Sequence, residues 1–418
     1  RNFASKRSDG GHFTIYYPTG KDELIVDLTG EVLERAYAVM KADFGYAPPA
    51  PVRVEILSDP SDLSRVSTLT EKEIDTTGTI ALCKYNKLMV VTPRATLFGY
   101  PWMDTMVHEY VHYVVSKSTR NNVPVWLQEG LARFEQSRWR RAPGLALTAV
   151  DEHLLATALA KKRLITFDAM HPSMAKLPSQ EAATLAFAEV YTMVAYLHGR
   201  IGYAGLRKAL AISRSGTSVR AALAQVAGET WPEIERGWKR HLAEAGLDRQ
   251  PALAGRAKNH HIHFKKGATA GDPENVRLAE IDSARARKYA RLGGILRVRG
   301  MPQAAATEYE KALSVAGSDP LITAKLSRTY LDLGNYARAI ELALPIAAMD
   351  EDDAAASTTL GVAYLATDDA ARAATAFEAA LRINPFDPTV RCGLAKAYAA
   401  IGKSRLATRA SAACVKLR

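Results

Sequence analysis

The stretch His108-Glu109-Tyr110-Val111-His112 lies inside an apolar run that is typical of a buried helix. On a helix, residues four apart share one face about one turn apart, so His108 and His112 present two imidazoles side by side. Glu109 lies next to them and can reach a water molecule on a shared cation. Further along the chain, Glu129 offers a carboxylate as a third ligand. Three protein ligands and one open position are typical of a catalytic zinc site.

A second motif strengthens the interpretation of the first as a metal site. It is Val-Pro-Val-Trp-Leu-Gln-Glu-Gly-Leu-Ala at 123–132. The five-residue H-E-x-x-H pattern alone also arises by chance on helices that hold no metal. Paired with W-L-x-E-G-x-A at this distance, it resembles the gluzincin peptidases, in which the Glu of the second motif binds zinc. The resemblance implies one Zn²⁺ held by His108, His112 and Glu129, with Glu109 as the general base.

The first hundred residues predict a small mixed sheet with one or two helices. Residues 1–10 are polar and predict no regular structure, and 84–86 predict a turn. Asp59-Pro-Ser-Asp62 predicts the start of a helix. Periodicity and β-forming residues predict strands at 12–17, 52–57, 79–83 and 87–92, and a helix at 28–44.

Residues 101–247 predict an almost wholly helical half. After the two motif helices, helical stretches are expected at 149–161, 181–199, 203–211, 219–227 and 231–245. The family resemblance extends to bacterial peptidase-MA-like metallohydrolases and implies an α+β, thermolysin-like zincin domain over residues 1–247. Its halves would be the sheet-bearing 1–100 and the helical 101–247, with a cleft between them that admits a polypeptide.

The C-terminal part, residues 272–418, contains an internal repeat. Gly300, Gly334 and Gly402 fall in one phase of a period of about 34 residues, and Asp368 stands at the missing position. The same period recurs in Ala305, Ala339, Ala373, Tyr330, Tyr364, Tyr398, Pro320 and Pro388. This pattern resembles the tetratricopeptide repeat and implies about four helix pairs stacked into an all-α solenoid. Residues 248–271 predict a linker with one short strand at 261–264.

The tetrahedral intermediate of peptide hydrolysis carries negative charge, so a donor must face its oxygen. Related enzymes use a Tyr or His well downstream of the third ligand, and Tyr191 lies at a plausible distance after Glu129. The alternative is that Tyr191 and Tyr196 only pack between helices. Tyr85 and His198 are lesser candidates for the same role.

Further polar residues bear on metal binding. Asp104 lies one turn before His108, where it could orient that imidazole or cap the helix. His260, His261 and His263 could suggest a second metal site, but histidines in a linker are more often exposed to solvent.

Composition limits the class of protein. The net charge is +11 with a pI near 9.4, yet the basic residues are spread along the chain and form no known nucleic-acid motif. No apolar run is long enough to predict a membrane span. Cys83, Cys392 and Cys414 are too few for a disulfide framework and are expected to be buried thiols. The chain begins at Arg1, so a processed form is expected, and export to a periplasm or the medium is implied only by the resemblance.

The sequence therefore predicts a zinc metallopeptidase whose repeats bind a protein partner or substrate. The G-x-M-E-N segment of gluzincin aminopeptidases is absent, and the segment at 78–82 has no acidic residue in its place. This favours an endopeptidase. The alternative is a non-catalytic or autoinhibited zinc-binding protein that uses the repeats as a scaffold, although zinc ligation alone does not require Glu109.

Overall fold

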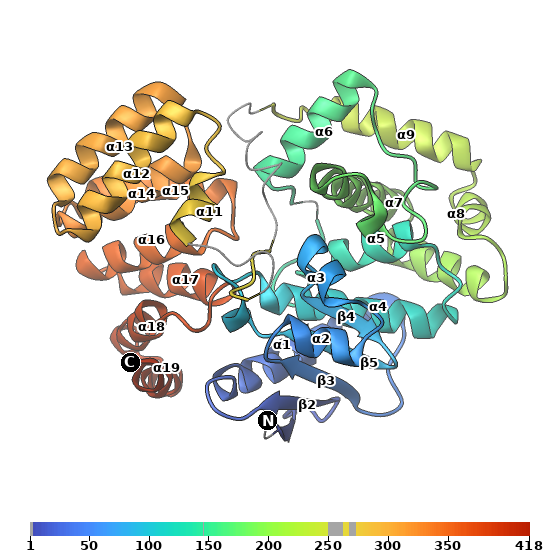
Figure 1. The fold of residues 1–418 in the computed structure, drawn as a ribbon. Coiled ribbons are helices and arrows are strands. Elements are labelled where there is room, and N and C mark those ends of the chain that lie inside the picture. Colours follow the sequence, from blue (N-terminus) through green and yellow to red (C-terminus); the bar gives the residue numbers. More distant parts are fainter. Residues whose placement is uncertain (1–2, 145, 250–261, 267–272) are drawn as a thin grey trace. The chain divides into compact units, whose positions relative to one another are not determined.

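The structure is a computed structural model that describes residues 3–144, 146–249, 262–266 and 273–418 (Figure 1). The chain forms two compact units. Unit 1 contains residues 1–92 and 103–249, and unit 2 contains residues 93–102 and 250–418. This division differs from a simple break after residue 247, because the segment that leads into the H-E-x-x-H helix groups with the repeats.

Unit 1 contains the small mixed sheet that the sequence predicts. Its strand order is β1-β2-β3-β5-β4. The β2–β3 and β3–β5 pairs are parallel, and the β1–β2 and β4–β5 pairs are antiparallel. The strands are β1 (Phe3–Arg7), β2 (Phe13–Pro18), β3 (Val52–Leu57), β4 (Ala81–Lys84) and β5 (Lys87–Val91). Four of these five strands, β2 to β5, lie where the sequence predicts strands.

Strand β1 was not predicted, and the expectation of irregular structure over residues 1–10 is wrong. Residues Phe3–Arg7 pair antiparallel with β2, although four of the five side chains are exposed. An edge strand on a pre-existing sheet is held by backbone hydrogen bonds, which need no apolar side chains. Composition therefore carries little signal for such a strand.

The helices of unit 1 cover the sheet and build the helical half (Figure 1). They are α1 (Glu23–Phe44), α2 (Pro60–Val66), α3 (Glu71–Thr77), α4 (Trp102–Thr119), α5 (Val125–Glu135), α6 (Ala149–Lys161), the short η2 (Met174–Lys176), α7 (Gln180–Arg214), α8 (Val219–Ala227) and α9 (Trp231–Glu244). The two helices expected at 181–199 and 203–211 are confirmed: both lie within α7, on either side of a kink at Gly202, where the backbone is not helical and φ is +60°. The Asp59 side chain caps α2 as predicted, by accepting from the Asp62 N–H.

Unit 2 contains four helical hairpins in its described part, residues 273–418. After the short α11 (Pro273–Leu278) come α12 (Ala284–Val298), α13 (Pro302–Ala316), α14 (Pro320–Asp332), α15 (Tyr336–Met349), α16 (Ala354–Ala366), α17 (Ala370–Leu381), α18 (Pro388–Ala400) and α19 (Ser404–Leu417). The turn within each hairpin contains one residue with positive φ: Gly300 (+73°), Gly334 (+71°), Asp368 (+59°) and Gly402 (+75°). The repeat phase thus marks left-handed helix ends, which Gly and, less readily, Asp can adopt.

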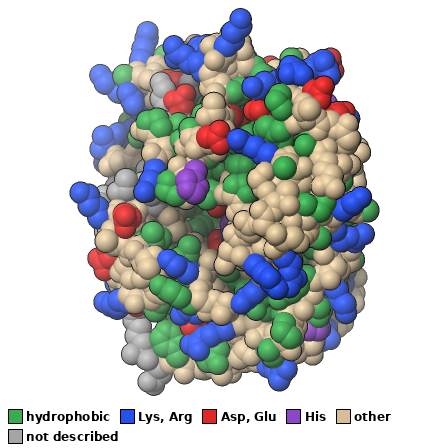
Figure 2. All heavy atoms as spheres, turned by 90° about the vertical axis from the view of Figure 1, so that its right-hand side faces the viewer, with side chains coloured by type: hydrophobic (Ala, Val, Ile, Leu, Met, Phe, Trp, Pro, Cys, Tyr) green, Lys and Arg blue, Asp and Glu red, His purple; other side chains and the backbone are tan. Residues whose placement is uncertain are grey.

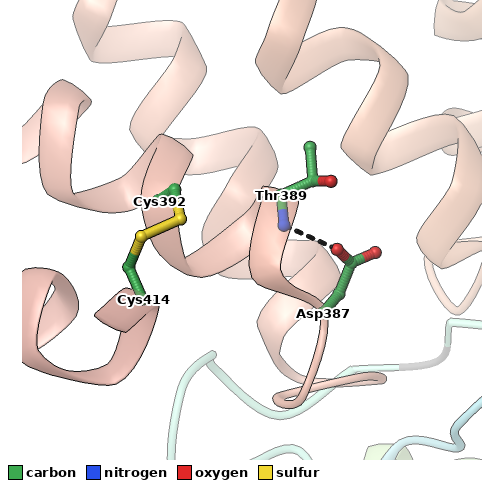
Figure 3. Close-up of a disulfide and its surroundings, with 4 residues drawn as sticks. All are labelled: Asp387, Thr389, Cys392 and Cys414. Carbon is green, nitrogen blue, oxygen red and sulfur yellow. Dashed lines mark hydrogen bonds between the residues drawn. A yellow bond between two sulfur atoms is a disulfide. The ribbon is translucent and has the colours of Figure 1, made fainter. Parts of the chain in front are cut away.

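The prediction that all three cysteines are buried thiols is wrong for two of them. Cys392 on α18 and Cys414 on α19 form a disulfide with a Cα–Cα distance of 4.9 Å (Figure 3). The two cysteines come together only because α18 and α19 fold back on each other. Cys83 remains a free thiol, as predicted, but it is only partly buried.

The segment from Pro93 to Trp102, which includes the short η1 (Pro93–Ala95), packs within unit 2. Its backbone pairs with the linker through a bridge between Thr96 and Phe264, a part of the strand predicted at 261–264; residue 261 lies outside the described residues. The Trp102 indole N–H donates to the Leu381 carbonyl over 3.1 Å, and its side chain is 1% exposed. The chain thus passes through the repeat domain just before α4 begins.

The surface agrees with the basic composition. Figure 2 shows Lys and Arg side chains distributed over one whole face, not gathered in one block. Within the described ranges, no helix is both long and apolar enough to cross a membrane.

Candidate metal centre

Helix α4 is held against the sheet by the residues between the motif's polar positions. Tyr110 and Val111 are fully buried, and the Tyr110 ring meets the ring of Phe13 on β2 edge to face at 5.1 Å. His108 and His112 keep about 15% of their side-chain surface exposed. The helical period therefore separates an apolar side that anchors α4 from a polar side that carries the imidazoles.

Helix α5 brings Glu129 to the same place because it packs very closely on α7. A Cβ at Gly130 would lie 2.8 Å from the carbonyl oxygen of Val190, so only glycine fits there. Trp126, one turn before Glu129, stacks on Phe167 with ring centroids 4.8 Å apart. The spacing of Trp, Glu and Gly in the second motif thus has a packing reason.

The three side chains predicted as metal ligands converge. The His108 and His112 Nε2 atoms are 3.1 Å apart, and they lie 3.3 and 3.5 Å from one Glu129 oxygen. Ligands placed about 2.0–2.1 Å from a tetrahedral zinc ion are about 3.3 Å from one another. In the part of the chain that the structure describes, no other group of three His, Cys, Asp or Glu side chains brings its ligand atoms so close. The spacing and the N/N/O donor set fit a zinc ion.

Gln136, the residue after α5, fixes the orientation of His108. Its side-chain oxygen lies 3.2 Å from the His108 Nδ1 atom. An oxygen acceptor at Nδ1 places the proton there and leaves the Nε2 lone pair facing His112 and Glu129. Two imidazole lone pairs facing each other repel unless a cation or a proton lies between them. Sequence reasoning missed Gln136, although it follows Glu129 by two helical turns, a spacing that returns to the same helix face.

Glu109 is nearly buried and is tied to the edge of the sheet. Its carboxylate accepts a hydrogen bond from the backbone N–H of Cys83 on β4. Burial raises the pKa of Glu109 above its ordinary value, although His112 and His108 act in the opposite direction. A carboxylate with a raised pKa is a better proton acceptor near neutral pH, as a general base requires.

The charges of the centre favour a cation. Burial lowers the pKa of His112, but Glu129 and Glu109 outweigh it and raise the pKa to about 9. Burial raises the pKa of Glu129, but the two imidazoles outweigh it and lower the pKa far below the usual range. The same negative charge that favours a proton on His112 favours a metal ion in its place.

Tyr191 lies in α7 with its hydroxyl engaged by a neighbouring loop. It accepts from the Ala146 N–H over 2.8 Å and donates to the Gly144 carbonyl over 3.2 Å. The side chain is 4% exposed, and its ring packs near Phe134. This arrangement supports the packing alternative, and a role at the oxyanion stays a prediction.

The other candidates have separate positions. Tyr196 accepts from Arg200 within α7, and His198 packs its ring between Phe134 and Tyr203. Tyr85 lies at the exposed tip of the β4–β5 hairpin. All three therefore lie on α7 or on the hairpin tip, and none belongs to the group of converging ligand atoms.

Asp104 forms a contact that differs from both of its predicted roles, which were to orient His108 or to cap the helix. Its carboxylate accepts from the Trp139 indole N–H over 2.7 Å and pairs with Arg140 over 2.7 Å. It therefore ties the start of α4 to the loop after α5, while Gln136 orients His108. Of the linker histidines, His260 and His261 lie outside the described residues.

The fold and the site together define a two-part protein with a candidate mononuclear metal centre and a helical-repeat domain. Residues 33–244 match the model of the Peptidase MA superfamily, and the chain belongs to that superfamily. Residues 325–388 match a tetratricopeptide-repeat model, as the repeat phase predicts. A search of curated proteins finds no match.

Several solved structures resemble part of the chain. MamA from Desulfovibrio magneticus RS-1 is 18% identical, with a TM-score of 0.30, over 35% of this chain and 83% of MamA. A thermophilic tetratricopeptide-repeat protein from Thermus thermophilus is 25% identical, with a TM-score of 0.29, over 32% of this chain and 74% of that protein. The first such domain of human RPAP3 is 19% identical, with a TM-score of 0.27, over 29% of this chain and 95% of that domain. TM-scores this low carry no argument about function.

Proposed function

We propose that this protein is a zinc-dependent endopeptidase of the gluzincin type with a thermolysin-like catalytic domain. The observation that carries the proposal is the convergence of His108, His112 and Glu129 within 3.5 Å of one another. Membership of the Peptidase MA superfamily supports it. A zinc ion bound there would activate water and polarise the scissile carbonyl.

The chain's own groups have distinct tasks in the reaction. Glu109 accepts the proton of the attacking water and delivers it to the leaving amine, and the Cys83 N–H holds its carboxylate in place. Gln136 holds the His108 ring in one tautomer. Strand β4 ends the sheet and leaves one edge open to pair with an extended peptide.

The repeat domain would bind a protein partner or deliver the substrate. Stacked helical hairpins form extended surfaces that bind peptides. We further propose that the protein works in an oxidising compartment, such as a periplasm or the extracellular medium. The Cys392–Cys414 disulfide supports this, since such bonds persist where thiols are not kept reduced.

The test is the Glu109→Gln variant of the full chain, assayed for casein and peptide cleavage and for zinc content. We expect about one zinc ion per chain in both proteins, removal of activity by a chelator, and its return on addition of zinc. The variant should keep the metal and lose at least about a hundredfold in kcat, because the proton acceptor is missing.

Glu244→Gln is the matched control, because Glu244 is an exposed carboxylate at the end of α9. It should leave the rate unchanged. Cleavage that survives Glu109→Gln unaltered would show that the enzyme assignment is wrong. Bound zinc without any cleavage by the wild-type chain would favour the non-catalytic scaffold.

A further inference from the structure

A pocket of about 200 Å³ lies in unit 1 between the tip of the β4–β5 hairpin and the second half of α4. Its lining includes Cys83 and Lys84 from the hairpin and Tyr113, Ser116 and Lys117 from α4. None of the lining residues is acidic. The pocket therefore differs in charge from the candidate metal centre, which contains two carboxylates.

The pocket continues the line of the metal centre along α4. Ser116 follows His112 by four residues, so it lies on the same helix face about 6 Å further along the axis. On the hairpin side, the Cys83 backbone N–H binds Glu109, and the rest of Cys83 lines the pocket. A substrate whose scissile bond lies at Glu109 thus has this pocket one or two residues away.

The open edge of β4 would guide a peptide past the pocket. The Val91 N–H donates to the Ile80 carbonyl, so this pair is hydrogen-bonded in the antiparallel ladder. Because hydrogen-bonded pairs alternate, the backbone groups of Ala81 and Cys83 point away from β5. Strand β4 is last in the sheet, so the Ala81 backbone groups and the Cys83 carbonyl are available to an extended chain, whereas the Cys83 N–H is bonded to Glu109.

The two lysines give the pocket lining a positive charge, and the nearest carboxylate that the contacts identify, Glu109, is bonded to the Cys83 N–H and not to either lysine. Among the described residues, neither Lys84 nor Lys117 forms an ion pair. Lys84 donates to the neutral Thr68 hydroxyl over 2.7 Å, and the Lys117 ammonium lies 5.7 Å from the Tyr113 ring centroid. The C-terminal end of α4 contributes about half a negative charge, which is less than two ammonium groups supply.

We propose that this pocket binds a carboxylate of the peptide substrate and makes the enzyme prefer a negative charge near the scissile bond. The inference rests on the proposed function, because it identifies the substrate class of the same site. Either an acidic side chain or the free C-terminal carboxylate of a short peptide has the required chemistry. The experiment below separates these two sources.

Binding is measured with zinc-loaded full-length Glu109→Gln protein and fluorescent peptides, so that no turnover is needed. Matched peptides carry Glu or Gln at each successive position, and each is made with a free or an amidated C-terminus. We expect one position at which Glu binds about tenfold more tightly than Gln, a difference that shrinks at high salt. If the free C-terminus supplies the carboxylate, peptides with a free C-terminus bind more tightly than their amidated forms, and Glu and Gln peptides bind alike.

Lys84→Met and Lys117→Met, each in the Glu109→Gln background, should reduce this preference to nearly none. Lys208→Met is the matched control, since Lys208 is exposed on α7 and away from the pocket lining. The proposal would be overturned if Glu and Gln peptides bind equally and amidation of the C-terminus also changes nothing. A carboxylate preference that both pocket variants keep would overturn it as well.

The same peptides are then given to the protein with Glu109 intact. Cleavage without a carboxylate preference would overturn the pocket and leave the peptidase standing. A carboxylate preference in binding that depends on the two lysines, without any cleavage, would support the pocket and overturn the peptidase proposal.

Discussion

At the scale of single residues, a proposed metal ligand is held in place by a polar neighbour outside the proposed ligand set. His108 faces Gln136 on one side and the Glu129 oxygen on the other. Such partners hold a ring in the position and tautomer that a metal needs. Gln136 should therefore contribute to metal affinity without touching the metal.

The Gln136→Leu variant should bind zinc about 10–100-fold more weakly, because the His108 ring loses the acceptor at Nδ1. The measurement is competition for zinc against a chromophoric chelator. Gln225→Leu, at an exposed position of α8, is the control and should bind zinc like the wild type. If the Gln136→Leu variant binds zinc as tightly as the wild type, a group other than Gln136 fixes the tautomer of His108.

Glu189 on α7 predicts a pH dependence of stability. It is fully buried and accepts one hydrogen bond, from the Ile165 N–H, and burial raises its pKa to about 8. The folded state thus prefers the neutral acid. The resulting stabilisation is complete below the ordinary pKa near 4.5 and is lost as the pH rises through about 8.

The Glu189→Gln variant is neutral at every pH. It should match the wild type in free energy of unfolding near pH 5 and exceed it at pH 9 by on the order of a few kcal/mol. Urea unfolding at the two pH values measures this difference. Glu181→Gln, an exposed position in the first turn of the same helix, should show no such gain.

At the scale of elements, the repeat domain is built from one hairpin used again with small changes. Asp319, Asp353 and Asp387 share one phase of the repeat, and each accepts a backbone N–H at the start of a helix, α14, α16 and α18 respectively. Tyr330 and Tyr398 each donate to a glutamate of the preceding helix, Glu310 and Glu378. The last hairpin adds the Cys392–Cys414 disulfide between α18 and α19 (Figure 3).

Reduction of the Cys392–Cys414 bond should lower the free energy of unfolding of the repeat domain by about 3 kcal/mol, because the bond closes a loop with a sequence separation of 22. Urea unfolding with and without a thiol reductant, followed by circular dichroism, measures the change. The Cys392→Ser/Cys414→Ser double variant is the control and should not respond to the reductant. An equal response in both proteins would point to Cys83 instead.

At the scale of the whole molecule, the segment 93–102 links the repeats to the start of the H-E-x-x-H helix through the chain itself. Within unit 2, the Tyr100 N–H donates to the Ile383 carbonyl, and Trp102 donates to Leu381. Trp102 is also the first residue of α4. Disturbance of the repeats near α17 should therefore reach the beginning of the helix that carries both histidines.

Gly99→Ala tests this link. Gly99 has φ of +80°, and a Cβ there would lie 2.3 Å from the Ile383 carbonyl oxygen. Gly20→Ala is the control, because Gly20 has φ of +105° with open space around it. Both should lose about 1–2 kcal/mol from the positive φ, and Gly99→Ala should lose about 1–3 kcal/mol more from the close contact. The measurement is urea unfolding. Equal losses of unfolding free energy in the two variants would show that the segment 93–102 can shift away from Ile383 without destabilising the protein.

The sequence alone determined the features that depend on local order along the chain. Two imidazoles four residues apart must share a helix face. Alternation predicted β2 and β3, runs of β-forming residues predicted β4 and β5, and the repeat phase predicted the turns of the hairpins, including the one at Asp368. Tertiary structure decided the features that depend on contacts between segments far apart in the sequence. These are the Gln136 contact with His108, the salt bridge of Asp104, the disulfide, the paired edge strand β1, and the grouping of residues 93–102 with the repeats. The physical reason is that side-chain pattern reports which face of an element is buried, whereas the partner of that face is fixed only when the chain is packed.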